Sequence, residues 1–238
     1  LKSYLSMVKI KKVLDDFKYL GAKSVEITGG GEPMLYRDKE TKDDINSIIE
    51  YAYNLGYEIG MITNTGKLNR LKKENFSKLK WLRISLIKLD EGFNPEDYDF
   101  CGFPEDKMGL SYIIYDEDKG TGTRINKPYI PTNRETIKKI AKVIELHPKI
   151  KFVRIAGNCL EKGNNAKVRN DFKDIIDEID TNKKIFIKDI GFDDSAYKEA
   201  CYVGLIRPYV APSPNGKGEY KIYMCTSHVL NTKNYDLD

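Results

Sequence analysis

The segment that decides the fold is Val25-Glu26-Ile27-Thr28-Gly29-Gly30-Gly31-Glu32-Pro33, where an apolar strand runs into three glycines, an acid and a proline. Glycines at the carboxyl end of a strand let backbone groups approach a small ligand, because no Cβ stands in the way. The carboxylate of Glu32 adds an acceptor for a cationic group such as an amine. Ligands of α/β folds bind at the carboxyl ends of parallel strands. The segment therefore predicts half of a binding site whose ligand carries an ammonium group.

Helical and strand-like patterns alternate on both sides of this segment, which predicts parallel βα units. The apolar spacing predicts helices over residues 6–20, 41–55, 69–80, 133–146 and 167–179, with Thr41 as the N-cap of the second and Asp44 in its capping box. It predicts strands over residues 24–28, 57–63, 81–87, 108–115, 150–156 and 185–190, with an irregular excursion over 88–106. The count predicts an α/β fold with a partial (β/α)6 barrel; an open doubly wound sheet is the alternative.

The last part of the chain has a different pattern. Two strand-like segments, 203–210 and 219–224, flank a turn at Pro212-Ser213-Pro214-Asn215-Gly216, which predicts a β-hairpin. We therefore divide the chain into a barrel over residues 1–195 and a small C-terminal extension over residues 196–238.

Composition narrows the classes of function. The 238 residues hold 40 Lys and Arg against 36 Asp and Glu, and this small excess does not define a nucleic-acid surface. No apolar run approaches the roughly 18 residues that a membrane span needs. Four cysteines in a chain of this length do not make a secreted disulfide framework, so a reducing cytoplasm is the expected compartment. Two histidines, His147 and His228, leave little capacity for histidine-based acid–base or zinc chemistry.

The Thr28-Gly29-Gly30-Gly31-Glu32-Pro33 segment resembles the Gly-Gly-Glu motif of the radical S-adenosylmethionine (SAM) enzymes. In that family the motif follows the second strand of a partial barrel and holds the methionyl amine of SAM. The resemblance assigns Gly29, Gly30, Gly31 and Glu32 to that amine. It assigns Asn64 and Ser85 to the carboxylate or ribose, and the backbone at Ile155 to the adenine. Without the resemblance, Asn64 is a turn residue and Ser85 and Ile155 belong to the core.

The family signature Cys-x-x-x-Cys-x-x-Cys does not occur in this sequence. Such a loop binds three irons of a [4Fe–4S] cluster and leaves the fourth for SAM. The cysteines here are Cys101, Cys159, Cys201 and Cys225, and no two are close in the sequence. We expect either that the chain begins after the cluster loop or that it is a relative that lost it.

The C-terminal extension resembles that of the SPASM and twitch subfamilies, in which cysteines around a hairpin ligate auxiliary Fe–S clusters. By that resemblance, Cys201 and Cys225 are metal ligands, brought together by the hairpin. Two thiolates are fewer than the four that a cluster usually takes. The alternative is two buried cysteines in a small β-extension.

The resemblance implies an oxidoreductase that reductively cleaves SAM to a 5′-deoxyadenosyl radical, which abstracts a hydrogen from a substrate. A SPASM-like ending favours a peptide or protein side chain as substrate, and an electron donor such as flavodoxin or ferredoxin is implied. A tRNA base is a second substrate class, so nucleic acid stays open as a partner. Two other readings are a non-catalytic, cluster-less barrel that serves as a binding or scaffold subunit, and an unrelated α/β enzyme whose glycine-rich loop binds another cationic or phosphorylated ligand.

Overall fold

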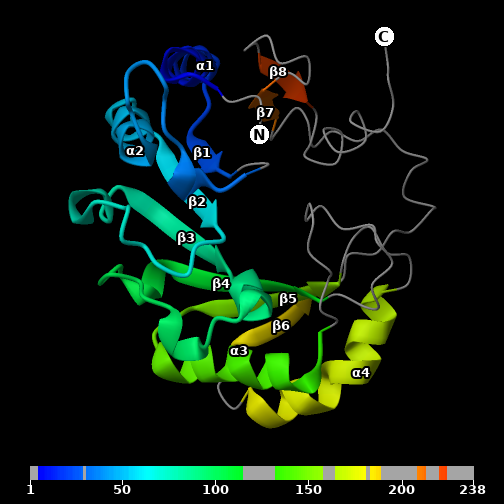
Figure 1. Cartoon of the computed structure of the whole chain (residues 1–238). Helices are drawn as coiled ribbons and strands as arrows, with labels where there is room; N and C mark the ends of the chain where they lie inside the picture. Colours follow the sequence, from blue (N-terminus) through cyan, green and yellow to red (C-terminus); the bar gives the residue numbers. More distant parts are fainter. Residues whose placement is uncertain are drawn as a thin grey trace, which may run out of the picture.

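The computed structural model describes residues 5–28, 31–114, 132–157, 164–180, 183–188, 208–212 and 220–223. Within them, six parallel strands pair in chain order (Figure 1): β1 Ser24–Ile27, β2 Glu58–Thr63, β3 Leu79–Ser85, β4 Met108–Ile114, β5 Phe152–Gly157 and β6 Ile185–Lys188. Strands that pair in this order need a crossover between each pair, which is the arrangement of a partial barrel. The predicted α/β class with six parallel strands is confirmed.

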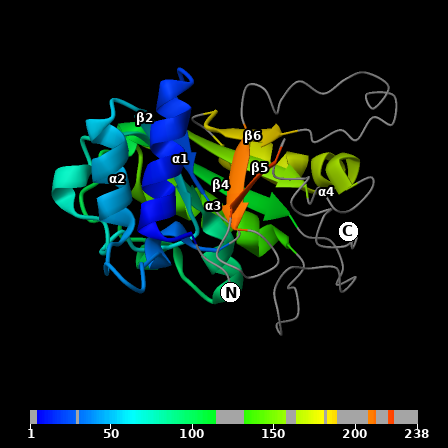
Figure 2. The same ribbon diagram turned by 90° about the horizontal axis from the view of Figure 1, so that it is seen from above.

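Four α-helices are described: α1 Met7–Tyr19, α2 Ile45–Asn54, α3 Arg134–Leu146 and α4 Asn164–Ile179. Helices α1 and α2 lie side by side near β1 and β2, and α3 and α4 lie side by side near β5 and β6 (Figures 1 and 2). The chain leaves α1 through Gly21, whose φ of 92° is the left-handed conformation typical of a helix end. Asn133 begins α3 as predicted, because its Oδ1 accepts the backbone N–H of Thr136 at 3.0 Å.

The start of α2 was predicted incorrectly. Asp44, and not Thr41, is the N-cap, and its carboxylate accepts the N–H of Asn46 at 2.8 Å. Thr41 is instead held by Asp38, whose Oδ1 accepts the N–H groups of Glu40 and Thr41. Asp38 Oδ2 also accepts the N–H of Met7 at 2.6 Å, so one carboxylate caps α1 from a distant loop. Asp38 is 1% exposed, and these bonds lower the pKa of its carboxyl below the ordinary value.

The helix predicted over residues 69–80 is also wrong. The segment holds the 3₁₀ turn η2, Lys73–Asn75, and its last two residues already belong to β3. Asn46 on α2 accepts the N–H of Lys72 at 2.9 Å and donates to the carbonyl of Arg70 at 3.0 Å. Asn75 is fully buried and donates to Asn46 Oδ1 at 3.0 Å. The buried Asn46 amide therefore satisfies two backbone groups of the segment, and Asn75 holds that amide in place.

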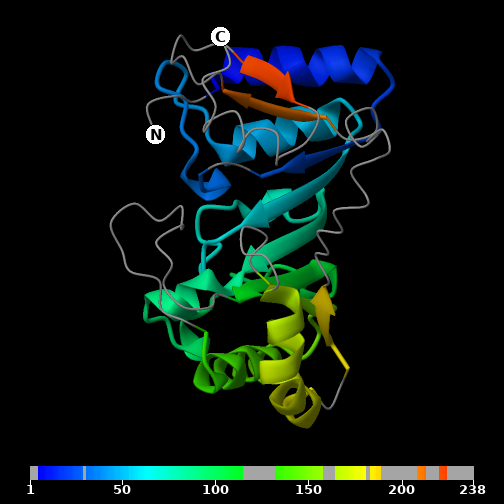
Figure 3. The same cartoon turned by 90° about the vertical axis from the view of Figure 1, so that its right-hand side faces the viewer.

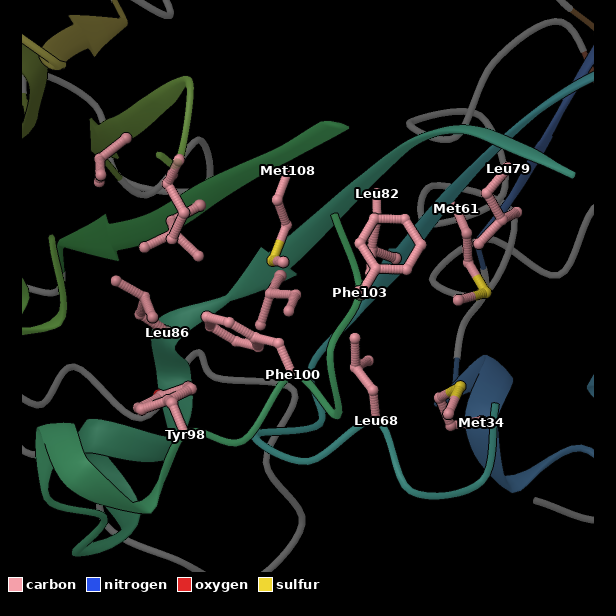
Figure 4. Close-up of a cluster of buried hydrophobic side chains, with 14 of the residues drawn as sticks. Met34, Met61, Leu68, Leu79, Leu82, Leu86, Tyr98, Phe100, Phe103 and Met108 are labelled. Carbon is pink, nitrogen blue, oxygen red and sulfur yellow. The ribbon is translucent and has the colours of Figure 1, made fainter. Parts of the chain in front are cut away.

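The excursion between β3 and β4 is irregular, as predicted, and consists of three short 3₁₀ turns: η3 Leu86–Glu91, η4 Pro95–Asp97 and η5 Glu105–Lys107. Its aromatic side chains turn inward and join the core (Figure 4). Phe103 meets Phe76 edge to face, with centroids 5.2 Å apart. The main core therefore lies between the sheet and the elements on its helical side.

The C-terminal hairpin is confirmed as an antiparallel pair, β7 Tyr209–Pro212 with β8 Tyr220–Tyr223. Its first strand extends to Pro212, two residues beyond the predicted end. The pair lies beside α1 and β1 (Figures 1 and 3). This position agrees with the raised pKa of the Tyr209 hydroxyl, which is due first to burial and then to the carboxylate of Glu26 on β1.

Candidate functional site

The carboxyl ends of β1 and β2 are joined through the side chain of Glu32. Glu32 Oε1 accepts the N–H of Met34 at 2.9 Å and the hydroxyl of Thr63, the last residue of β2. Glu32 Oε2 accepts the N–H of Asn64 at 2.6 Å. The Thr63 hydroxyl also accepts the N–H of Thr65 at 3.2 Å, so its orientation is fixed. The half-buried carboxylate is thereby held at the edge where the ligands of parallel sheets bind.

This carboxylate retains capacity for a ligand. An ionised carboxylate has about four acceptor positions. Oε1 has two donors and Oε2 has one, so one position on Oε2 is open among the described contacts. A hydrogen bond to an ionised oxygen is stronger when the donor is also charged. The geometry therefore suits an ammonium group as the fourth donor.

Other residues predicted for the site lie near Glu32. Gly31 precedes it and is exposed. Asn64 contributes its backbone N–H, and its side chain is exposed. Ser85 is the half-buried last residue of β3, and Ile84 before it pairs in register with Thr63, so Ser85 and Asn64 end neighbouring strands. These positions bring four predicted residues to one edge.

The remaining predicted residues are elsewhere or not described. Ile155 is fully buried in the middle of β5, where its register partners are Tyr112 and Ile187. Only its backbone could therefore meet a ligand. Gly29, Gly30, Cys201 and Cys225 lie outside the described residues.

Thr63 is the residue that the sequence analysis missed. It is 2% exposed and donates to Glu32 from the end of a strand of apolar residues. Its position in the sequence could have indicated this role. A polar residue at the end of a buried strand lies at the edge of a parallel sheet where ligands bind.

The two faces of the sheet differ in composition. Residues on one strand alternate between faces, and residues in register share a face. The row Ile27, Met61, Leu82 and Met108 belongs to the helix-covered face, and its last three members are at most 1% exposed. The row Ser85, Ser111, Arg154 and Phe186 belongs to the other side, which we call the open face. Phe186 is 45% exposed, so solvent reaches this face.

Aromatic rings and charges line the open face. The Trp81 ring lies over Gly60, where an added Cβ would approach it to 2.1 Å, and the Phe152 ring lies over Gly109 in the same way. Glu26 of β1, Arg83 of β3 and Arg154 of β5 also belong to this face. Burial lowers the pKa of the Arg154 guanidinium, and Glu26 opposes that shift.

The described residues do not form a site for an Fe–S cluster or another metal. No group of three or more His, Cys, Asp or Glu side chains among them could hold a metal ion. Cys101 is the one cysteine in the described part of the chain, and burial first, then Asp99, raises the pKa of its thiol. This environment disfavours the thiolate that a cluster requires. Among the described helices, none is long and apolar enough to cross a membrane.

A hollow of about 540 Å³ lies in the excursion between β3 and β4. Its lining includes Asp99, Cys101, Glu105 and His147, and His147 Nδ1 is 3.0 Å from Glu105 Oε1. The hollow does not include Glu32, Asn64 or Ser85. It is therefore separate from the predicted site.

Comparison with known proteins gives distant structural likenesses. No family model and no curated protein matches the chain. SuiB of Streptococcus suis bound to S-adenosylmethionine is 18% identical with a TM-score of 0.42, over 75% of this chain and 41% of SuiB. SuiB bound to the precursor peptide SuiA is 17% identical with a TM-score of 0.46, over 79% of this chain and 43% of SuiB. This chain spans less than half the length of those SuiB chains.

Proposed function

We propose that this chain is the SAM-binding part of a radical SAM enzyme that acts on a peptide or protein side chain. The observation that carries the proposal is the Glu32 carboxylate, which three donors hold at the ends of β1 and β2 with one acceptor position open. An α-ammonium group fits that position by charge and by hydrogen bonding. The resemblance of the Gly-Gly-Gly-Glu segment to the family motif supplies SAM as the ligand.

In this proposal each site residue has one role. Glu32 binds the methionyl amine, and the glycines before it let the backbone come close. Asn64 and Ser85, which end neighbouring strands, bind the carboxylate or ribose. The backbone at Ile155 lies along the adenine. The division into a barrel over residues 1–195 and an extension over 196–238 remains part of the proposal.

The residues present do not fit a [4Fe–4S] cluster, so we derive no step that passes through one. A cluster bound beside SAM would supply the electron that cleaves SAM to methionine and a 5′-deoxyadenosyl radical. Its three thiolates would have to come from outside these 238 residues, because the four cysteines here lack the spacing. Cys201 and Cys225 stay proposed as ligands of an auxiliary cluster.

The second candidate is a non-catalytic barrel that binds a ligand or partner. It is favoured by the sequence, because the four cysteines lack the Cys-x-x-x-Cys-x-x-Cys spacing. Both candidates predict SAM or a related amine at Glu32. They differ in whether bound SAM is cleaved.

The first experiment measures equilibrium binding of SAM and of 5′-methylthioadenosine, which lacks the methionyl amine. Glu32→Gln should weaken SAM binding at least about tenfold and leave 5′-methylthioadenosine unchanged, because a charge-assisted bond is lost. Glu58→Gln is the matched control, since Glu58 is exposed at the start of β2 and pairs with Lys80. Equal SAM affinity in the folded Glu32→Gln protein would contradict the proposal.

A second variant separates binding from positioning. Thr63→Val removes one donor to Glu32 and keeps the carboxylate. It should lower stability by about 1 kcal/mol, as Glu32→Gln should, and weaken SAM binding much less. The catalytic candidate is then tested by Fe–S reconstitution, reduction and detection of 5′-deoxyadenosine. A chain that binds SAM and forms no 5′-deoxyadenosine supports the non-catalytic candidate.

A further inference from the structure

We propose that Arg154, with Arg83 and Ser111, binds a carboxylate of the peptide substrate on the open face of the sheet. The inference rests on the proposed function for the peptide class of the substrate and adds the chemical group that is recognised.

Three charged residues of the open face belong to one layer of the sheet. In a barrel, residues of alternate strands form a layer, because the strands are staggered. Glu26 of β1 is in register with Trp81 of β3, and Arg83 lies two residues beyond Trp81. Arg83 is in turn in register with Phe152 of β5, and Arg154 lies two residues beyond Phe152. Burial lowers the pKa of Arg154, and the carboxylate of Glu26 partly offsets that shift although three strands lie between the two residues. The layer holds two guanidinium groups and one carboxylate.

The burial and hydrogen bonding of Arg154 indicate that it has a ligand. Its side chain is half-buried, and its Nε is buried with no hydrogen-bond partner. No described residue forms a hydrogen bond with any of its five donors. Burying a cation that lacks hydrogen bonds costs free energy, so such a group is expected to have a ligand. The register partner of Arg154 on β4 is Ser111, whose hydroxyl adds a donor on the same face.

The guanidinium of Arg154 and the apolar surface beside it determine which ligand fits. A guanidinium matches a carboxylate with two parallel hydrogen bonds. The rings of Phe152 and Phe186, with centroids 5.7 Å apart, flank Arg154 on the same face. Phe186 is 45% exposed and Ile113 is 39% exposed, so apolar surface is accessible beside the charge. A glutamate or aspartate side chain next to an apolar residue of a peptide fits this combination.

Arg154 and the residues proposed to bind SAM belong to different strands. Glu32 is hydrogen-bonded to Asn64, the residue after β2, whereas Arg154 is on β5, three strands further along the sheet. We therefore assign the anion at Arg154 to a second molecule, the peptide. SAM binding by the Arg154→Gln variant tests this assignment.

The test uses Trp81, which is the one tryptophan of the chain and lies on the open face. Its fluorescence is followed while the chain is titrated with acetyl-Phe-Glu-amide or acetyl-Phe-Gln-amide up to about 50 mM, the range of single-contact affinities. We expect the glutamyl peptide to bind at least about tenfold more tightly. Arg154→Gln should remove that preference, and Arg154→Lys should retain part of it. Arg134→Gln is the control, since Arg134 pairs with Asp174 at the surface.

Three outcomes would overturn the inference: equal affinity for both peptides, no binding of either, or an unchanged preference in Arg154→Gln. A further result would reassign the residue, since Arg154 would belong to the SAM site if Arg154→Gln abolished SAM binding. The peptide titration needs no SAM cleavage. Failure of the proposed function at Glu32 and failure of this inference are therefore distinguishable.

Discussion

The two faces of the sheet carry opposite chemistry, although their residues alternate along the same strands. Ile84, Leu110 and Val153 form one row of the helix-covered face, and each is fully buried. The neighbouring row of the open face holds Ser85, Ser111 and Arg154. The first face supplies the apolar burial that stabilises the fold. The second carries hydroxyls, charges and aromatic rings and is partly exposed, with Phe186 at 45%. We therefore assign most of the stability of the fold to the helix-covered face.

The largest expected effect tests this assignment with the same substitution on both faces. Ile84→Ala removes a fully buried side chain from the helix-covered face and should lower the free energy of unfolding by about 3–4 kcal/mol. Ile113→Ala, at a position of the open face that is 39% exposed, should cost about 1 kcal/mol. Urea unfolding measures both. Equal losses would mean that the open face contributes to the core as much as the other.

The next effect concerns the fully satisfied buried carboxylate on the helical side. Asp38→Asn places an amide where three N–H groups point at a carboxylate, and should cost about 2–3 kcal/mol at neutral pH. The folded-state pKa of Asp38 is lowered, so its contribution is complete above the unfolded pKa of about 3.9 and is lost as the pH falls below it.

Urea titrations from pH 7 to pH 3 measure this contribution. The difference in stability between the wild type and Asp38→Asn should shrink on acidification. Asp16→Asn is the control, because Asp16 forms an exposed pair with Lys12 and should cost less than about 1 kcal/mol. A difference that stays constant with pH would show that Asp38 acts through packing.

The third effect tests the aromatic lining of the open face. An alanine Cβ at Gly60 would approach the Trp81 ring to 2.1 Å, so Gly60→Ala must displace the indole and should cost about 1–3 kcal/mol. The tryptophan emission should shift with the displaced ring. The same substitution in a Trp81→Ala background should cost much less, because the clashing ring is gone. Additive losses would place the strain elsewhere.

Strong local patterns predicted most of the fold. Period-3.6 and strand-like apolar segments located the main helices and all six parallel strands, and the turn residues located the hairpin. The errors came from tertiary contacts. Residues 69–80 have a helical pattern, but Asn46 of α2 forms hydrogen bonds with the backbone of Arg70 and Lys72, and Asn75 donates to Asn46. Asp44 replaces Thr41 as the cap because Asp38 holds Thr41.

The candidate site was predictable in part for the same reason. The Gly-Gly-Gly-Glu segment is local, and its carboxylate was recognised from the sequence. The roles of Thr63, Arg83 and Arg154 were not predicted from the sequence, because they depend on how the strands pair in register. A one-residue change in pairing would move each of them to the other face. Register between strands that are far apart in the chain is not encoded in any single segment.

The smallest expected effect sharpens the comparison between a buried charge with partners and one without them. Asp38 stabilises the fold through its hydrogen bonds, whereas Arg154 is half-buried with no hydrogen bond to the described residues. Replacing such a cation with an apolar side chain of similar length removes a desolvation cost. Arg154→Met should therefore leave the free energy of unfolding unchanged or raise it by up to about 1 kcal/mol. Arg134→Met, which breaks a surface pair with Asp174, should lower it by less than about 1 kcal/mol. A loss of more than about 1 kcal/mol in Arg154→Met would show that Glu26 already compensates the charge, and the open face would then be a structural layer like the face opposite.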